Sequence, residues 1–420
     1  MIDSLTQTIR PFIPKKVFLF LQPTYHRLLA FISALIYRFP SRHIRVIAVT
    51  GTKGKSSVTE ILNAILEEAG HKTTVSNTIR FKIANQSEPN LYKMSMPGRF
   101  AIQKFLRKAV NANCDTAIVE MTSQGSLLYR HLWIELDTLI FTNLSPEHIE
   151  AHGSYGNYVN SKLALARALS TSAKKDTTLI VNNDDKEASK FLDYSAKQKI
   201  KYGVRDAEPY KVNGEGIDFT FDGVNMHSPL SGLINLYNVL AAATTAKSLG
   251  VKSDVIQKAV SHFGHIPGRI QKINMGQEYD VVVDYAHTPD SLEKFYAVFH
   301  DKRNICVLGG TGGGRDAWKR SEMGRIADEH CDIIILTDED PYDEDPTTIV
   351  NDVAKGITKH IPSIIMDRRL AIHEALKQAK KDDAVLITGK GTDPFIMGPN
   401  GTKKPWSDAT VTEEEIRKLK

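Results

Sequence analysis

The sequence predicts an α/β protein with mostly parallel sheets, because short apolar runs alternate with segments of helical spacing. The first run, at residues 44–49, leads into a glycine-rich segment at 50–57, and apolar residues then recur at helical spacing from 58 to 66. The stretches between the runs are long enough for the helices that connect parallel strands. Seven further runs have the composition of buried strands, at 116–120, 138–143, 178–182, 281–284, 305–308, 333–337 and 384–388.

Length and composition describe a folded protein of more than one domain. The chain has 420 residues, of which 41% are hydrophobic and 25% charged, and it shows no repeat or low-complexity tract. These values exclude disordered, collagen-like and fibrous classes. The three cysteines, Cys114, Cys306 and Cys331, are odd in number and lack metal-ligand spacing. We therefore expect neither a disulfide framework nor a zinc ribbon, and a reducing cytoplasm.

The N-terminal segment is both apolar and basic. Residues 1–45 contain seven Lys and Arg side chains against one acid, whereas the rest of the chain is nearly neutral. This excess is a local electrostatic feature, and it does not indicate nucleic-acid binding. The apolar run at 28–37 is well short of the roughly 20 residues that span a bilayer. We expect a helix that packs on the protein body or that lies, through residues 10–42, on an anionic membrane surface.

Residues 50–57, TGTKGKSS, have the composition of a phosphate-binding loop. A loop that follows a strand and opens a helix presents backbone N–H groups and the helix dipole to an anion. Glycines let the backbone approach phosphate oxygens, Lys55 supplies a cation, and Ser56 can hold Mg²⁺, so ATP and Mg²⁺ are the expected cofactors. Val49 stands where the full P-loop pattern has its first glycine, so this is a shortened variant. The expected nucleotide contacts are Gly51, Thr52, Lys53, Gly54, Lys55, Ser56 and Ser57.

The loop resembles that of the Mur ligase superfamily, ATP-dependent enzymes that join amino acids to a peptidoglycan stem, and further matches follow in the family's order over 46–408. The resemblance implies a central P-loop ATPase domain with a mostly parallel sheet, followed by a Rossmann-like C-terminal domain. We expect a basic apolar helical segment at 1–44, an ATP-binding domain at 45–265 and an amino-acid-binding domain at 266–420. The implied setting is peptidoglycan and cell wall biosynthesis, in the cytoplasm, by a monomer.

Four residues are expected to hold magnesium. Glu120 ends an apolar strand, where its carboxylate would face the ligand crevice of an open α/β sheet beside Ser56. By resemblance, His148 in the segment TNLSPEHIEAHG at 142–153 is a ligand of a second magnesium ion. Lys162 falls where many Mur ligases carry a carbamylated lysine, which the resemblance implies here. The expected catalytic residues are Lys55, Glu120, His148 and Lys162.

Further nucleotide contacts are expected in the second half of the chain. Residues 235–238, NLYN, resemble the family's N-x-x-N segment, although Asn235 taken alone suits a helix N-cap equally. The segments PGR at 267–269 and VDYAHTP at 283–289 resemble motifs of the MurE-type branch, which adds the third stem residue. The residues implied to contact the nucleotide are Asn235, Asn238, Arg269, Asp284, His287 and Lys319.

A second glycine loop, at 309–314, resembles the loop at which MurE enzymes seat the incoming amino acid. Arg315 would clamp the amino acid's carboxylate, for which a planar bidentate donor is suited. TDEDPY at 337–342 stands where diaminopimelate-adding enzymes have D-N-P-R, and GKGTD at 389–393 replaces G-K-G-H-E. Losing the arginine and gaining an acid favours a cationic side chain such as lysine or ornithine, with diaminopimelate left open. The expected contacts are Arg315, Asp340, Tyr342, Gly389 and Asp393.

The sequence defines the acceptor site least. MurE enzymes usually carry a domain before the phosphate loop that binds the acceptor's uridine nucleotide, whereas only 45 residues precede Val46. We expect either a UDP-MurNAc-dipeptide held in a different way or another carboxylate. Ser95, Thr122, Ser123 and Arg130 lie where the family has acceptor contacts.

These parts together imply a carboxylate–amine ligase. Mg²⁺ and the cationic loop neutralise the γ-phosphate while an acceptor carboxylate attacks it, giving ADP and an acyl phosphate that the amine then attacks. Two alternatives stay open. A folylpolyglutamate synthetase would carry a glycine between Lys55 and Ser56, and a nucleotide-binding subunit of an amidotransferase complex would carry a four-cysteine zinc insert.

Overall fold

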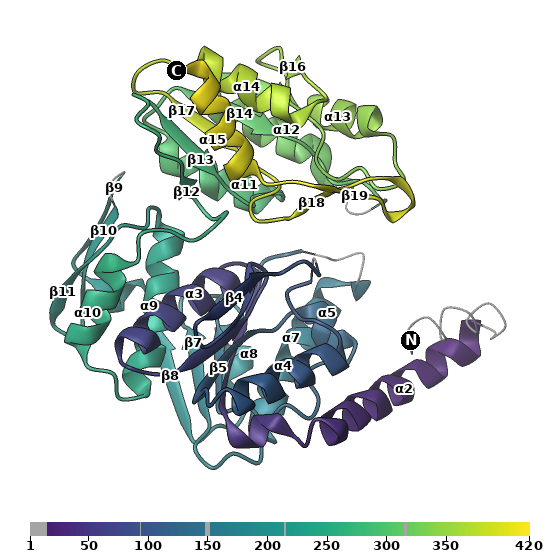
Figure 1. The fold of residues 1–420 in the computed structure, drawn as a ribbon, viewed down its shortest axis with the longest axis vertical. Helices are drawn as coiled ribbons and strands as arrows, with labels where there is room; N and C mark the ends of the chain where they lie inside the picture. Colours follow the sequence, from purple (N-terminus) through teal and green to yellow (C-terminus); the bar gives the residue numbers. More distant parts are fainter. Residues whose placement is uncertain (1–14, 93, 148–151, 214–215, 315–316) are drawn as a thin grey trace. The chain divides into compact units, whose positions relative to one another are not determined.

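The computed structural model describes residues 15–92, 94–147, 152–213, 216–314 and 317–420, with side chains from residue 21 onward (Figure 1). Contacts between Cα atoms divide the chain into two compact units. Unit 1 comprises residues 1–203 and 241–251, and unit 2 comprises 204–240 and 252–420. The predicted α/β class with mostly parallel sheets is confirmed. The predicted division of the chain at residues 44 and 265 stays a prediction.

Unit 1 is built on an eight-stranded sheet with the spatial order β4-β3-β2-β5-β1-β6-β7-β8. The six strands from β2 to β8 in this order pair in parallel, and β3 and β4 extend one edge through two antiparallel pairings. Both edges are polar: β4 is fully exposed and contains Glu88 and Pro89, and β8 exposes Lys199 and Lys201. The strands are β1 (Arg45–Thr50), β2 (Thr73–Ser76), β3 (Arg80–Ile83), β4 (Gln86–Pro89), β5 (Thr116–Glu120), β6 (Thr138–Phe141), β7 (Thr178–Asn182) and β8 (Gln198–Tyr202).

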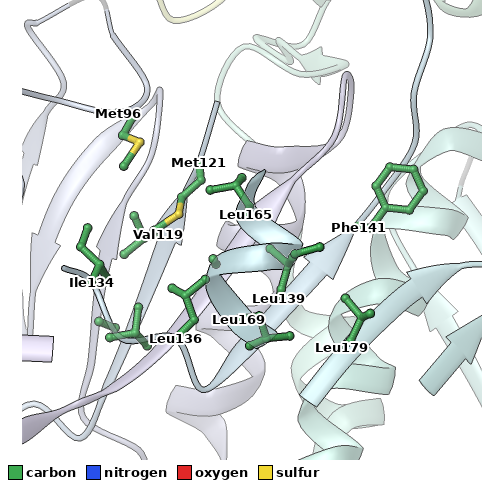
Figure 2. Packing of buried hydrophobic residues seen from close by; sticks show 14 of the residues in the cluster. Met96, Val119, Met121, Ile134, Leu136, Leu139, Phe141, Leu165, Leu169 and Leu179 are labelled. Carbon is green, nitrogen blue, oxygen red and sulfur yellow. The ribbon is translucent and has the colours of Figure 1, made fainter. Parts of the chain in front are cut away.

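Helices cover the sheet of unit 1 and bury its apolar strands. Because parallel strands are buried on both faces, they are continuous apolar runs. Figure 2 shows strand residues such as Leu139 and Leu179 beside Leu165 and Leu169 of α7 in one apolar cluster. The helices are α2 (Lys15–Ile36), α3 (Lys55–Glu68), α4 (Arg99–Asn111), α5 (Ser123–Leu127), α7 (Tyr155–Ser170) and α8 (Ala188–Leu192), with the short 3-10 turn η2 (Pro40–His43).

The predicted N-terminal helix forms as α2, which packs on α4. Leu29 and Ala34 on its inner side are buried, whereas Leu21, Leu28 and Leu35 recur every seven residues and are each more than half exposed. α2 contains no acidic residue. Within the described part of the chain, no helix has the length and hydropathy needed to cross a membrane.

Unit 2 holds a six-stranded sheet with the order β12-β13-β17-β14-β15-β16, parallel except for β12. Alternate residues point to opposite faces, so Val282 and Leu308 enter one apolar cluster while Val283 and Val307 enter another. The strands are β12 (Gln271–Lys272), β13 (Asp280–Val283), β14 (Asn304–Leu308), β15 (Ile333–Leu336), β16 (Ser363–Ile364) and β17 (Ala384–Ile387).

Smaller elements complete the fold. A three-stranded antiparallel sheet contains β9 (Tyr210–Asn213), β10 (Gly216–Phe221) and β11 (Val224–Ser228), and a hairpin pairs β18 (Phe395–Met397) with β19 (Lys403–Pro405). The remaining helices are α9 (Leu233–Ser248), α10 (Ser253–His262), α11 (Pro289–Tyr296), α12 (Lys319–His330), α13 (Pro346–Ala354), α14 (Arg368–Gln378) and α15 (Asp408–Leu419), with the 3-10 turns η3 (Val204–Ala207), η4 (Ala297–Phe299) and η5 (Pro399–Gly401).

All eight strands predicted from apolar runs are present, each within two residues of its predicted ends. The expectation of no disulfide is wrong, because Cys306 on β14 and Cys331 after α12 are bonded, while Cys114 is free and buried. α12 brings the Cα atoms of the bonded cysteines to 6.0 Å, a proximity that their separation of 25 residues does not reveal. The inference of a reducing compartment from unpaired cysteines therefore loses its basis.

Candidate active site

The phosphate loop lies between β1 and α3 in unit 1. Gly51 has a φ of 146°, and a Cβ there would lie 1.9 Å from Thr142 Oγ1. Gly54, with a φ of 83°, is the N-cap of α3, which begins at Lys55. Glycine is therefore required at both positions, at one for space and at the other for its left-handed backbone. The N-terminal N–H groups of α3 are the donors that bind phosphate oxygens in such loops.

Hydrogen bonds from the neighbouring β6 loop and from α7 hold the phosphate loop. Asn143 Oδ1 accepts from the Lys53 backbone N–H at 2.9 Å, and Thr142 Oγ1 donates to the Lys53 carbonyl at 2.7 Å. The hydroxyls of Thr52 and Tyr158 are 2.7 Å apart. The loop is thus held in place by the protein, so a bound phosphate would not have to order it.

Three predicted residues meet at the carboxyl ends of two neighbouring strands. β1 and β5 pair with Val49 opposite Glu120, so the strand-end acid lies beside the loop that follows β1. Ser56 Oγ donates to Glu120 Oε2 at 2.8 Å, and Lys55 Nζ lies 3.9 Å from Glu120 Oε1. A hydroxyl and a carboxylate are the oxygen ligands that magnesium prefers, so this pair fits the ion.

Thr78 also contacts Glu120, and sequence reasoning missed it. Its backbone N–H donates to Glu120 Oε2 at 3.0 Å, and its hydroxyl lies 3.1 Å from Oε1. His148, the predicted ligand of a second ion, lies outside the described residues. Among the residues that are described, no three His, Cys, Asp or Glu side chains form a group that could bind a metal.

Lys162 is buried in α7 and contacts the phosphate loop. Its Nζ donates to the Gly51 carbonyl oxygen at 2.6 Å and lies 4.9 Å from the centre of the Tyr158 ring. Burial, followed by the nearby charge of Lys55, lowers the pKa of Lys162 well below its usual value. A lowered pKa increases the fraction of neutral amine, which is the nucleophilic form.

The predicted acceptor residues lie on segments of the same unit. The hydroxyls of Ser95 and Thr78 are 2.5 Å apart, and Arg130 donates to the Met96 carbonyl oxygen at 2.6 Å. Thr122 caps α5 by accepting from the Gly125 backbone N–H. Ser123 Oγ lies 3.2 Å from Nε2 of His152, a buried residue that sequence reasoning did not select.

In unit 2, the PGR turn and the end of β13 form one cluster. Asp284 accepts from the Ile270 N–H through one oxygen and from the Ala286 N–H through the other, each at 2.7 Å. The Arg269 guanidinium lies 4.4 Å from the centre of the Tyr285 ring. His287 Nδ1 lies 2.7 Å from the carbonyl oxygen of Tyr285. Arg269, Asp284 and His287, which the sequence places on two motifs, are therefore neighbours.

Asn235 and Asn238 lie within the first turns of α9, which begins at Leu233. Asn238 donates to Asn235 Oδ1 at 3.0 Å, and Asn235 donates to the Ser231 carbonyl oxygen at 2.8 Å. The N-cap role considered for Asn235 is wrong, because the residue is inside the helix. Lys319 is the first residue of α12 and is largely buried.

One lysine joins two of the predicted amino-acid contacts. Lys390 Nζ lies 2.8 Å from Asp340 Oδ1 and 3.2 Å from Asp393 Oδ2, and the Met397 backbone N–H donates to the same Asp340 oxygen. The fully buried ammonium of Lys390 therefore offsets the negative charge that Asp340 was expected to add. Tyr342 adopts a left-handed φ of 54° beside this group, and Arg315 lies outside the described residues.

Glu339 is a second acid at this place that sequence reasoning passed over. It is 3% exposed, and burial raises the pKa of its carboxyl group. Oε1 accepts from the Thr311 hydroxyl at 3.0 Å, while Oε2 has no hydrogen-bond partner among the described residues. A Cβ at Gly389 would lie 2.3 Å from Oε2, so the loop 389–393 passes directly over this carboxyl group. The sequence alone does not distinguish Glu339, because it is one of several acids in the same run.

Comparison with known proteins identifies the family. The Mur ligase middle domain matches residues 49–246, and the Mur ligase glutamate ligase domain matches residues 268–391. A UDP-N-acetylmuramoyl-L-alanyl-D-glutamate–2,6-diaminopimelate ligase of Syntrophomonas wolfei is 34% identical over 417 residues, which is 96% of this chain and 84% of that protein. The chain belongs to the Mur ligase family. The family predicted from the phosphate loop and the DYAHTP segment is thus confirmed, as is its ATP-dependent, ADP-forming ligase chemistry.

Other Mur ligases of the MurE type are similarly related. The Clostridium tetani enzyme of the same name is 33% identical over 407 residues, covering 93% of this chain and 81% of that protein. A solved structure of such a diaminopimelate ligase has a TM-score of 0.61 at 26% identity and covers 90% of this chain and 79% of that chain.

Folylpolyglutamate synthase shares the fold. The Mycobacterium tuberculosis enzyme, solved with ADP and AMPPCP, has a TM-score of 0.69 at 14% identity and covers 94% of this chain and 95% of that chain. An identity this low shows likeness of fold alone, whereas the two MurE-type relatives are 34% and 33% identical to this Mur ligase over the aligned residues. The comparisons thus favour a MurE-type ligase of peptidoglycan precursor synthesis over a folylpolyglutamate synthetase.

Proposed function

We propose that this Mur ligase uses ATP and Mg²⁺ to join a diamino acid, such as lysine or diaminopimelate, to a UDP-MurNAc-dipeptide-like acceptor. The observation that carries the proposal is the meeting of Lys55, Ser56 and Glu120 at the carboxyl ends of β1 and β5. This arrangement places a cation and two oxygen ligands at the start of a helix, where a nucleoside triphosphate binds.

The residues of the chain then have separate tasks. The N-terminal N–H groups of α3 and the Lys55 ammonium bind the phosphates and stabilise charge as the acceptor carboxylate attacks. Ser56 and Glu120 would hold the magnesium ion, which supplies further neutralisation of phosphate charge when bound. Arg269, Asp284 and His287 of unit 2 form the second nucleotide-binding group, with Asn235, Asn238 and Lys319 as further contacts.

Lys162 is proposed to be carbamylated. Its neutral amine attacks the carbon of carbon dioxide, forms an N–C bond and releases one proton, which leaves a carbamate anion. The lowered pKa and the full burial of Lys162 support this step, because only the neutral amine is nucleophilic. The carbamate oxygens would bind magnesium, as His148 is also proposed to do. The Lys162 amine, on which the carbamate would form, contacts the Gly51 carbonyl oxygen of the phosphate loop.

Selection of the amino acid is proposed to depend on the acids of unit 2. Lys390 already pairs with Asp340 and Asp393, whereas Glu339 Oε2 has no hydrogen-bond partner among the described residues, so Glu339 is proposed to take part in receiving a side-chain amine. A cation beside Glu339 would offset the cost of burying that carboxylate. The further proposed contacts are Asp340, Tyr342, Gly389, Asp393 and Arg315, with Arg315 at the carboxylate of the amino acid.

The acceptor is proposed to lie along Ser95, Thr122, Ser123 and Arg130, and the enzyme is proposed to be a cytoplasmic monomer. We also propose domains at 1–44, 45–265 and 266–420. The family models support this division, since one ends at residue 246 and the next begins at residue 268.

The reaction is tested by measuring phosphate release with ATP and UDP-MurNAc-L-Ala-D-Glu against lysine, ornithine, diaminopimelate and glutamate, with the product mass determined in each case. We expect release with a diamino acid and a matching gain in mass, because one oxygen of the buried Glu339 carboxyl group has no hydrogen-bond partner among the described residues. Turnover with glutamate and a folate, but none with this acceptor, would favour the folylpolyglutamate alternative. Binding of nucleotide without any turnover would favour the non-catalytic subunit.

The outer face of α2 is proposed to contact an anionic membrane through residues 10–42. Leu21, Leu28 and Leu35 form an exposed apolar stripe, flanked by the exposed Arg27, in a helix without acids. Each leucine placed in the bilayer interface would contribute about 1.5–3 kcal/mol, and the basic residues would add attraction to anionic lipids.

We expect the protein to sediment with phosphatidylglycerol vesicles and not with phosphatidylcholine vesicles. The double variant Leu28→Glu/Leu35→Glu should bind the anionic vesicles at least about tenfold more weakly, because it places two charges on the apolar stripe. Ile361→Glu is a matched control, since Ile361 is a fully exposed apolar residue of unit 2. Equal binding by the double variant and the control would contradict the contact.

A further inference from the structure

Thr78 connects two predicted sites that the sequence leaves separate. Its hydroxyl lies 3.0 and 3.1 Å from the two oxygens of Glu120, the proposed magnesium ligand, and 2.5 Å from the hydroxyl of Ser95, a proposed acceptor contact. Its backbone N–H adds a bond of 3.0 Å to Glu120. Thr78 lies in the short connection between β2 and β3, beside both residues.

The directions of these hydrogen bonds follow from charge. A hydroxyl has one proton to donate, and an ionised carboxylate only accepts. Because bonds to a charged acceptor are the stronger ones, the Thr78 proton goes to Glu120. The Ser95 hydroxyl then donates to Thr78 Oγ1, and Ser95 presents only lone pairs to a ligand. The group of the acceptor that meets Ser95 is therefore a donor, either a peptide N–H or a sugar hydroxyl, and not the reacting carboxylate.

We propose that Thr78 is a positioning residue that fixes the Glu120 carboxylate for magnesium and sets the direction in which Ser95 bonds to the acceptor. The Ser56 hydroxyl also donates to Glu120, but magnesium bound by both residues would compete with that bond. The two bonds from Thr78 do not involve a second metal ligand and continue to orient the carboxylate. The inference rests on the proposed function, because that function supplies the magnesium ion and the acceptor.

The experiment compares Thr78→Val, which keeps the shape and the backbone N–H, with Thr78→Ser, which keeps the hydroxyl. Removing a residue that orients a metal ligand by hydrogen bonding typically lowers the metal affinity about tenfold or more. In Thr78→Val we expect the Mg²⁺ concentration needed for binding of a fluorescent ATP analogue to rise about tenfold, and the KM for the acceptor to rise by a similar factor. Thr78→Ser should restore both values to within about twofold of the wild type.

Thr74→Val is the matched control. The Thr74 hydroxyl is buried on β2 and donates to the Lys82 carbonyl oxygen at 2.5 Å, so this variant removes a similar bond away from Glu120. We expect wild-type Mg²⁺ dependence and acceptor KM in the control. Unchanged values in Thr78→Val, or equal changes in Thr74→Val, would overturn the role of Thr78. A wild-type protein that binds no nucleotide with Mg²⁺ would instead overturn the proposed function itself.

Discussion

Lys55→Ala is expected to lower ATP turnover about a thousandfold or more, because one preorganised cation or donor at a developing charge contributes on this scale. Lys55 is the first residue of α3, and its Nζ lies 2.8 Å from the Thr52 carbonyl oxygen and 3.9 Å from Glu120. The measurement is phosphate release under saturating ATP, with circular dichroism and thermal unfolding to show that the variant folds.

The control for this variant is Lys190→Ala. Lys190 is an exposed lysine of α8 whose ion pair with Glu187 is of the surface type, which contributes little. The Lys190→Ala variant should keep wild-type turnover. Turnover within about tenfold of the wild type in Lys55→Ala would remove the phosphate loop from the mechanism.

Lys162→Met is expected to lower ligase activity at least about a hundredfold while leaving the protein at least as stable at neutral pH. Activity should fall because methionine cannot form the proposed carbamate. Stability is kept because burying an amine away from water costs free energy, and an unbranched side chain of similar length removes that cost. In the wild type, isotope-labelled bicarbonate should give a carbamate signal by carbon-13 NMR that the variant lacks.

The pH dependence of stability gives a second readout in bicarbonate-free buffer. The folded-state pKa of Lys162 lies below its ordinary value of 10.5, so between these two values the unfolded chain binds a proton that the folded protein does not. The free energy of unfolding contributed by this group therefore rises with pH across that window and levels off above 10.5. Denaturant unfolding at several pH values should show a shallower rise in Lys162→Met. An active variant with the same pH dependence as the wild type would contradict both the proposed role and the lowered pKa of Lys162.

The sequence predicted the position of a candidate site residue correctly where that residue stands next to a strand or loop that the sequence also predicts. The buried parallel strands are continuous apolar runs, and Glu120 could be placed beside Ser56 because residues at the carboxyl ends of neighbouring parallel strands share an edge. Gly51 and Gly54 were predicted from composition, and the structure gives the physical reason in close approach and a left-handed φ.

Residues that act through contacts remote in sequence could not be predicted in this way. Thr78 is one threonine between two short strands, and only the fold brings it to Glu120. Lys390 was treated as part of a motif, yet its ammonium binds Asp340, fifty residues away, and this changes the electrostatic meaning of that acid. The bond between Cys306 and Cys331 likewise depends on where α12 ends.

The edges of the eight-stranded sheet have a consequence for handling the protein. An exposed edge strand is a template on which another chain can pair, and lysines or a proline in that strand oppose such pairing. β4 ends in Glu88 and Pro89, and β8 exposes Lys199 and Lys201, so both borders are protected against strand-by-strand aggregation. Self-association in a concentrated preparation would then be traced first to the leucine stripe of α2, which salt would not disperse and a mild detergent would.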